Sequence, residues 1–288
     1  MVAFEIPYLH AKSALEITRK SGSNFTAAFH FLTPPPPRRA ALNVVYAFFR
    51  IVDDCVDEVL DVENKKTALN YWKQELAMVY HGRPDQPVMR ELQKVVKHYA
   101  IPESYLVGVV QGCEMDIFRT RYDTLAHLEN YCYHVASLVG LTCMQIFEHH
   151  SDTSRKAAID LGLAFQLTNI MRDVGSDLKV GRVYLPRDIM KRFAYSEADL
   201  MAGVENAAFF KIMDFFYERA AAYYDLAWPE FATDTSNKLL ATRAMAELYR
   251  AILHKLKREK FPVLRKRVRL NPLQKTKTLL PLLVKRIL

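Results

Sequence analysis

Long segments of this chain have apolar residues at every third or fourth position. This spacing constrains the fold more strongly than any other feature of the sequence. The repeat is clearest in residues 40–59, 155–178 and 204–227, and it gives an α-helix one apolar face. Glycine is scarce, with nine in 288 residues, and runs of β-branched residues are few. We therefore expect an all-α protein of roughly eight or more helices.

Short segments rich in proline or turn-forming residues separate the helical stretches. The breaks that we expect lie at 33–39, 81–87, 118–124, 184–188, 228–230 and 261–262. No change of composition marks a domain boundary, and no repeat of fixed period occurs. Because half of the residues are hydrophobic, the chain can bury a sizeable core. The sequence predicts a single domain over residues 1–288.

The cysteines and the N-terminus argue against secretion. The four cysteines, at 55, 113, 132 and 143, form no CxxC pair, so a disulfide framework or zinc site is not expected. The first residues lack a basic stretch followed by an apolar core, and no run of 18 uncharged apolar residues occurs. We expect a cytoplasmic protein that does not span a membrane.

Positive charge is concentrated at the C-terminus. Residues 250–288 hold 13 Lys and Arg and one acid, a net charge of +12, while the preceding residues carry a net charge of −4. Such a tail is a solvated face, or it binds nucleic acid, an anionic membrane or a phosphorylated substrate. It contains no nucleic-acid-binding motif, but its end, TLLPLLVKRIL, is similar to a short interfacial anchor. We expect peripheral contact with the inner face of the cell membrane and no nucleic-acid partner.

The first acidic cluster, YAFFRIVDDCVDE at 46–58, gathers like charges on a helix. Four of its side chains share an arc of about 60° on a helical wheel, and they are Tyr46, Arg50, Asp53 and Asp57. Asp54 and Glu58 form a second acidic pair on a neighbouring face. Like charges four residues apart destabilise an isolated helix by about 0.2–0.5 kcal/mol per pair.

The second cluster, NIMRDVGSDLKVGRVYLP at 169–186, contains a polar stripe on an otherwise apolar helix. The stripe covers an arc of about 80° and consists of Gln166, Asn169, Asp173 and Asp177. Gly175 weakens the helix by up to about 1 kcal/mol. We expect this glycine either to let another atom approach the helix closely or to mark a bend.

Two such clusters together favour a metal site, although either one alone is more typical of a solvated face. Carboxylates at this spacing bind hard divalent cations, and Mg²⁺ completes its coordination with water and ligand phosphates. Arg50 and Arg172 stand beside the acids and can bind the remaining oxygens of a diphosphate. We therefore expect a site for Mg²⁺, with Mn²⁺ as an alternative.

The two motifs resemble those of the squalene/phytoene synthase family. DDCVDE and NIMRDVGSDLKVGRVYLP are similar to its paired aspartate-rich motifs, and the resemblance extends to KSGSNF at 20–25, YCYHVASLVG at 131–140 and ELYRAIL at 247–253. Ser176 departs from the pattern, since many relatives have an acid there. The resemblance implies an isoprenoid-synthase helical bundle with a central active-site cavity, and Mg²⁺-dependent head-to-head prenyl transfer.

The resemblance also implies roles for individual residues. The expected metal ligands are Asp53, Asp57, Asp173 and Asp177, which with Tyr46 and Arg50 form the expected catalytic set. The other residues expected to contact prenyl diphosphate are Ser21, Ser23, Gln166, Asn169, Arg172 and Tyr249. The two serines are alternatively part of a helix-capping loop, and Tyr46 and Tyr249 are alternatively core residues. Only one of Tyr131 and Tyr133 can point inward from a helix, and the sequence leaves open which.

Within the family, SGSNF, GCEMDI at 112–117 and the YRAIL…RVRL ending resemble bacterial presqualene diphosphate synthases of the hopanoid route. The expected reaction condenses two farnesyl diphosphate molecules to presqualene diphosphate and releases diphosphate. Phytoene, dehydrosqualene and squalene synthase are the alternatives. NADPH is not expected, because no GxGxxG motif is present. A non-catalytic family scaffold would have lost motif aspartates, and this chain keeps all four.

Overall fold

A computed structural model describes residues 5–21, 36–59, 61–232 and 238–287 of the chain, with side chains except at 19–21 and 283–287. Within these residues every regular element is a helix, and one isolated bridge joins Arg121 to Val183. The predicted all-α fold is confirmed. The residues group into two compact units, Met1–Phe118 with Leu138–Arg155 and Arg119–Ser137 with Lys156–Leu288. The single domain over 1–288 stays a prediction.

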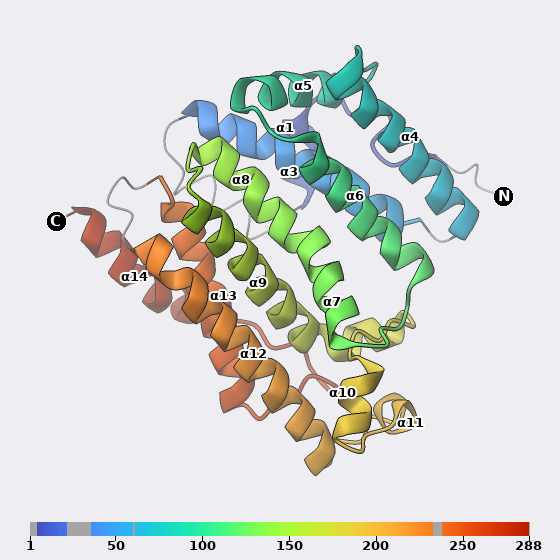
Figure 1. Cartoon of the computed structure of the whole chain (residues 1–288), viewed down its shortest axis with the longest axis vertical. Helices are drawn as coiled ribbons and strands as arrows, with labels where there is room; N and C mark the ends of the chain where they lie inside the picture. The colour runs from blue at the N-terminus through green and yellow to red at the C-terminus, as the bar shows by residue number, and fades with distance from the viewer. Residues whose placement is uncertain (1–4, 22–35, 60, 233–237, 288) are drawn as a thin grey trace. The chain divides into compact units, whose positions relative to one another are not determined.

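The first unit is built around the helix that carries the first acidic cluster, α3 (Pro36–Asp57). All the other helices of this unit pack against α3 (Figure 1). They are α1 (Ala14–Ser21), α4 (Val62–His81), α5 (Pro87–Tyr99), α6 (Glu103–Phe118) and α8 (Leu138–Phe147). The side chains at its centre include Phe48, Ile51, Trp72, Met89 and Leu92, all fully buried. This packing fixes the face of α3 that carries the acids.

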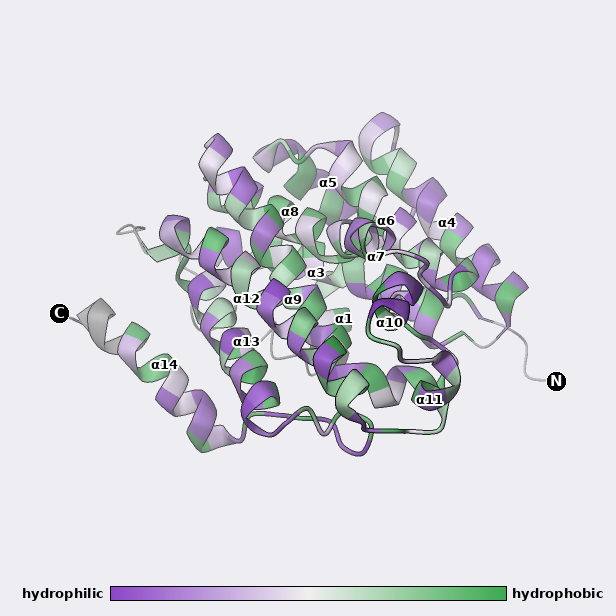
Figure 2. Cartoon of the chain, turned by 60° about the horizontal axis from the view of Figure 1, so that its bottom comes forward, coloured by the Kyte–Doolittle hydropathy of each residue, from purple (hydrophilic) through white to green (hydrophobic). Residues whose placement is uncertain are grey.

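The second unit contains the helix of the second cluster, α9 (Asp152–Lys179), whose first four residues belong to the first unit. In this unit α12 packs against α13, and α13 against α14 (Figure 1). Its remaining helices are α7 (Leu125–Cys132), the π-helix η1 (Tyr133–Ser137), α10 (Arg187–Arg192), α11 (Glu197–Met201), α12 (Ala207–Ala232), α13 (Leu240–Arg258) and α14 (Pro272–Ile287). Apolar and polar residues alternate along α9 and α13, as in amphipathic helices (Figure 2).

Most of the expected breaks separate helices, but the one at 228–230 is wrong. Helix α12 continues through Pro229 to Ala232. A proline inside a helix removes one backbone hydrogen bond, and Pro229 lies so near the end of α12 at Ala232 that less than one turn follows it. The buried Phe231 ties this turn to the core. Tertiary packing therefore outweighs the proline signal.

A close approach between α9 and η1 depends on a glycine. Ser137 of η1 donates from Oγ to the carbonyl of Ile159 on α9, at 2.8 Å. A Cβ at Gly162 would lie 2.5 Å from the Cα of Ser137, so only glycine fits here. This contact fixes the π-helix on α9, within the second unit.

All four cysteines are buried free thiols. Over the described residues, none of the helices is long and apolar enough to cross a lipid bilayer.

Candidate active site

The first cluster lies at the C-terminal end of α3. Asp53 and Asp57 are exposed, and Asp57 is the last residue of the helix, whose final turn holds no basic residue. The C-terminal end of a helix carries partial negative charge and disfavours anions. Two carboxylates are therefore held where the helix itself repels them, and the cluster attracts cations.

The pKa of Asp53 is raised, chiefly by desolvation and next by repulsion from Asp57. About 51% of the Asp53 side chain is accessible, yet the surrounding protein atoms desolvate the carboxylate. This desolvation, and next the negative charge of Asp57, raise the pKa of Asp53 to about 7. Arg50 opposes the rise only in part, since its Nη1 lies 3.4 Å from Asp53 Oδ2. A bound divalent cation would remove the repulsion.

Arg50 is held from its other side by Asp54, the completely buried member of the cluster. Arg50 Nε donates to Asp54 Oδ2 at 2.9 Å, and Nη2 lies 2.5 Å from Oδ1. Tyr8 Oη donates to the same Oδ2 at 2.5 Å. Helical spacing of the acids alone pairs Asp54 with Glu58 and predicts neither of these contacts. The four-residue spacing of Arg50 and Asp54 is a signal that could have revealed the ion pair.

The second cluster begins with an amide pair on α9. Asn169 Nδ2 donates to Gln166 Oε1 at 3.3 Å. Asn169 Oδ1 is buried and has no hydrogen-bond partner among the described residues. Leaving a buried acceptor unpaired costs about 1–3 kcal/mol, which a cation or a donor from a ligand would recover. The oxygen is of the type that Mg²⁺ prefers.

Two arginines form bidentate ion pairs with Asp173. Arg172 donates from Nε and Nη2 to its two oxygens at 2.9 and 2.6 Å, and Arg267 does the same at 2.6 and 2.8 Å. Burial alone would raise the pKa of Asp173, but the hydrogen bonds from Arg172 and Arg267 outweigh it and lower this pKa. Both arginines must share Asp173 with any metal that binds there. Arg267 opens the motif RVRL, but its pairing with Asp173, 94 positions away, was not predicted from the sequence.

Gly175 explains how Arg267 reaches the cluster. Its N–H donates to the carbonyl of Val263 at 3.2 Å, and a Cβ there would lie 2.5 Å from the same oxygen. Because glycine has no Cβ, the segment 262–270 can lie directly on α9. The close-approach interpretation of Gly175 is confirmed, and α9 remains helical through this residue.

Arg267→Gln should lower the free energy of unfolding at pH 7 by about 1 kcal/mol in metal-free buffer, a modest value because Arg267 is 44% exposed. The folded-state pKa of Asp173 is depressed, so the ion pair stabilises the protein above the ordinary range of a carboxyl group. This stability is lost as the pH falls through the folded-state pKa. The difference between wild type and variant should therefore shrink below about pH 4.

Urea denaturation across pH measures this effect. Arg265→Gln is the matched control, since Arg265 lies two residues away and pairs with Glu205. A deficit of Arg267→Gln that stayed constant down to pH 3 would show that Arg267 stabilises the protein without its charge pair.

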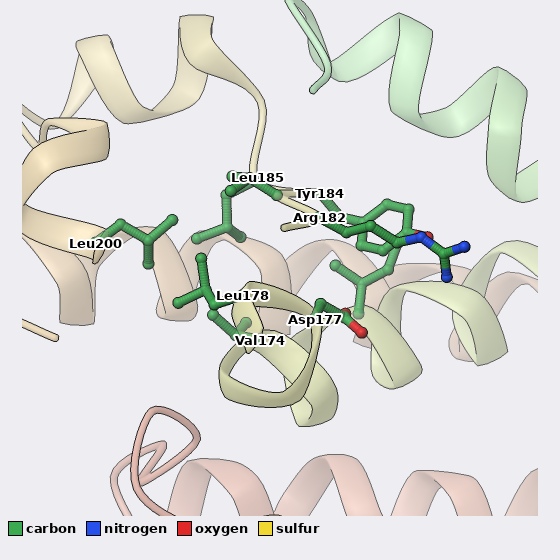
Figure 3. A pocket seen from close by; sticks show the side chains of 9 residues that line it. Val174, Asp177, Leu178, Arg182, Tyr184, Leu185 and Leu200 are labelled. Carbon is green, nitrogen blue, oxygen red and sulfur yellow. The ribbon is translucent and has the colours of Figure 1, made fainter. Parts of the chain in front are cut away.

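Asp177 lies in the last turn of α9 beside a small apolar cavity of about 10 Å³. Leu178, Leu185 and Leu200 line this cavity, and the polar ends of Asp177 and Arg182 lie on the side away from Leu185 and Leu200 (Figure 3). Such a volume admits about one water molecule. The cavity is therefore a packing feature that supports Asp177, and it cannot hold a prenyl chain.

Of the two tyrosines expected to contact substrate, Tyr249 belongs to the second unit and Tyr46 to the first. Tyr249 packs its ring on Phe165, with 4.7 Å between centroids, and interacts with Arg172. Burial lowers the pKa of Arg172, but the Asp173 carboxylate and Tyr249 outweigh it, so the net shift is upward. Tyr46 is half-buried on α3.

The choice between Tyr131 and Tyr133 is settled by burial. Tyr131 is buried, whereas Tyr133 is partly accessible at the start of η1. The ring of Tyr131 packs against those of Tyr122 and Tyr184, with centroids 5.5 and 5.4 Å away. Tyr131 is thus the inward-pointing residue, within the core of the second unit.

Two expected residues are not placed. Ser23 lies outside the described residues, and for Ser21 only the backbone is described, at the end of α1. Their expected contact with diphosphate stays a prediction.

The two clusters supply oxygen ligands for only part of the coordination shell of Mg²⁺. In the described part of the chain no three Asp, Glu, His or Cys side chains converge as a ready metal cage. Each cluster instead offers one or two carboxylates and, on α9, the unpaired oxygen of Asn169. Mg²⁺ commonly binds through one or two carboxylates and takes its other ligands from water and substrate phosphates. The residues present fit such an ion with a diphosphate ligand.

Comparison with known proteins gives consistent matches. The family model described as squalene/phytoene synthase matches residues 18–274. A phytoene synthase of Arthrospira platensis is 31% identical over 267 residues, which cover 88% of this chain and 86% of that protein. A presqualene diphosphate synthase of Rhodopseudomonas palustris is 31% identical over 260 residues, covering 90% and 92%. The crystal structure of a dehydrosqualene synthase matches with a TM-score of 0.83 at 27% identity, covering 95% of both chains.

Proposed function

Because the chain belongs to the squalene/phytoene synthase family, whose members condense prenyl diphosphates head to head, we propose that it joins two farnesyl diphosphate molecules to presqualene diphosphate. One inorganic diphosphate is released for every two substrates. The observation that carries this proposal is the pair of acidic clusters at the C-terminal ends of α3 and α9, each with an arginine beside its carboxylates.

The chain's own residues bind and orient the diphosphates in this proposal. Arg50 and Arg172 donate to diphosphate oxygens, and Tyr249 supports Arg172 from the neighbouring helix α13. Asp53 and Asp57 on α3 would hold Mg²⁺ through their carboxylates, and so would Asp173 and Asp177 on α9 together with the amide oxygen of Asn169. When bound, this ion would draw electron density from the diphosphate and ease cleavage of the C1–O bond of one substrate.

The carbon chemistry needs a dry environment. After cleavage, the C2=C3 bond of the second substrate attacks the allylic cation at C1, a proton leaves, and a cyclopropane ring closes. Water would quench the cation, so the apolar helix faces must exclude it. Buried aromatic rings such as Tyr131 fit this requirement, because their faces also stabilise positive charge.

The product is proposed from the motifs SGSNF, GCEMDI and RVRL. A phytoene synthase and a presqualene diphosphate synthase are each 31% identical to the chain, but most of the matching relatives are phytoene synthases, so overall similarity does not favour the presqualene product. Phytoene synthesis from geranylgeranyl diphosphate is therefore the second candidate function.

Product analysis separates these candidates. The purified protein is incubated with Mg²⁺ and either farnesyl or geranylgeranyl diphosphate, with and without NADPH, and both phosphorylated and hydrocarbon products are identified. Presqualene diphosphate formed regardless of NADPH supports the proposal. Squalene, dehydrosqualene or phytoene as the main product would replace the proposed reaction with one of the alternatives.

We also propose that the protein works at the inner face of the cell membrane, through α14. Many cations of the tail are paired within the second unit, including Arg250 with Asp225 and Lys257 with Asp214. On α14, however, Leu273 and Leu280 are 63% and 53% exposed. Their seven-residue spacing places them on one face, with the exposed Lys277 between them. Apolar residues flanked by lysine suit an anionic lipid surface.

The double variant Leu273→Ser/Leu280→Ser should reduce co-sedimentation with anionic liposomes several-fold while leaving turnover of micellar substrate unchanged, because two apolar side chains no longer enter the interface. Leu226→Ser is the control, since Leu226 on α12 is 59% exposed. Equal liposome binding by wild type and double variant would exclude α14 as the contact.

A further inference from the structure

The buried carboxylate of Asp54 connects the N-terminal segment to the first cluster. Asp54 is fully buried on α3 and accepts hydrogen bonds from Tyr8 and Arg50 on the same oxygen, Oδ2, at 2.5 and 2.9 Å. Its other oxygen lies 2.5 Å from Arg50 Nη2. Asp54 is therefore enclosed by Tyr8 and Arg50, whereas Asp53 and Asp57 on the same helix are accessible.

This arrangement fixes the direction of the Arg50 guanidinium. A guanidinium is planar and presents its N–H groups in a rigid fork. Asp54 binds the edge of the Arg50 guanidinium that carries Nε and Nη2. The remaining nitrogen, Nη1, is therefore directed toward the accessible acids, and it lies 3.4 Å from Asp53 Oδ2. A carboxylate buried beside an arginine holds it more firmly than an exposed one, because water does not compete for the hydrogen bonds.

Tyr8 adopts an unfavourable backbone conformation at this contact. Its φ is 61°, in the left-handed region that costs a non-glycine residue about 1–2 kcal/mol. Trp72 Nε1 donates to the neighbouring Pro7 carbonyl at 3.2 Å, so the segment is attached to the unit independently of the Tyr8 hydroxyl. Burial, and next the hydrogen bond to Asp54, raise the pKa of Tyr8 to about 12. The hydroxyl therefore remains a donor at neutral pH.

We propose that Asp54 and Tyr8 are positioning residues that aim Arg50 at the substrate diphosphate. This inference rests on the proposed function, in which Arg50 binds that diphosphate. Tyr8 orients Asp54, and Asp54 orients Arg50. Asp54, the second aspartate of the motif DDCVDE, thus orients the arginine one helical turn before it and does not act as a metal ligand.

A double-mutant cycle on the full-length protein tests whether Tyr8 acts through Arg50. The measured quantity is the Kd for inorganic diphosphate in the presence of Mg²⁺, determined by calorimetry. Tyr8→Phe should raise the Kd about three- to tenfold, the usual effect of one hydrogen bond. Arg50→Lys cannot form the fork, so in that background Tyr8→Phe should cause no further rise. Tyr80→Phe is the control, since Tyr80 donates to the Ile101 carbonyl in the same unit, and it should leave the Kd unchanged.

The outcomes separate this inference from the proposed function. An equal effect of Tyr8→Phe in both backgrounds, no effect in either, or no diphosphate binding by the wild type would each overturn the positioning role. Thermal melting of each variant shows whether it folds. Because the cycle measures diphosphate binding and not turnover, a failure to make presqualene diphosphate in the separate product assay would leave its result intact.

Discussion

Asp57→Asn should lower kcat/KM for farnesyl diphosphate about 10³-fold, and Asp177→Asn should do the same. Each substitution removes a carboxylate from a proposed metal site, where a bound ion contributes several kcal/mol of transition-state stabilisation. Asp57 ends α3 and Asp177 lies in the last turn of α9. Steady-state kinetics at saturating Mg²⁺ measures the loss.

Stability distinguishes a metal ligand from a structural residue. Asn at 57 removes the negative charge that helps to raise the pKa of Asp53, so the metal-free variant should be at least as stable as the wild type. Asp152→Asn, at an exposed acid in the first turn of α9, should keep full activity. A tenfold or smaller loss in both motif variants would mean that these aspartates do not carry the chemistry.

Gly175→Ala should both destabilise the protein and impair catalysis. The new Cβ would lie 2.5 Å from the Val263 carbonyl and 3.1 Å from Leu264 Cα. Because both are backbone atoms, the segment 262–270 must move, and Arg267 leaves Asp173. We expect a loss of about 1–3 kcal/mol in the free energy of unfolding, as overpacking usually causes. Chemical denaturation gives this value, and kinetics on the same sample gives the loss of activity.

Gly82→Ala is the matched control for this substitution. A Cβ at Gly82 also meets a close atom, but that atom is Sδ of the flexible Met78 side chain, at 2.8 Å, so the side chain can move aside. Its effect should be a few tenths of a kcal/mol. Equal stability of Gly175→Ala and wild type would mean that the segment on α9 is not fixed by this contact.

The sequence predicts the helices well where periodicity decides them. The expected stretch 155–178 is observed as Asp152–Lys179, and 40–59 as Pro36–Asp57. It fails at Pro229, where the local signal is strong but packing of Phe231 decides. Helical wheels also group the motif aspartates correctly on α3 and α9, because four-residue spacing is a property of the helix alone.

Helical periodicity and spacing do not predict contacts between segments that are distant in the sequence. Tyr8 meets Asp54 across 46 positions and Arg267 meets Asp173 across 94, and no local pattern specifies either pair. Gly175 is intermediate. Its small size predicts a close approach, but only the structure identifies the Val263 carbonyl as the neighbour. The sequence therefore reveals the acids and the two arginines beside them, Arg50 and Arg172, but not the distant partners Tyr8 and Arg267.

The stoichiometry of diphosphate release tests the central claim most directly. The full-length protein is incubated with farnesyl diphosphate and Mg²⁺, and released inorganic diphosphate is measured against substrate consumed. Condensation to presqualene diphosphate predicts one diphosphate for every two substrates, no release in EDTA, and recovery when Mg²⁺ is restored. One diphosphate for each substrate, or release that persists in EDTA, would contradict a metal-dependent condensation that ends at presqualene diphosphate.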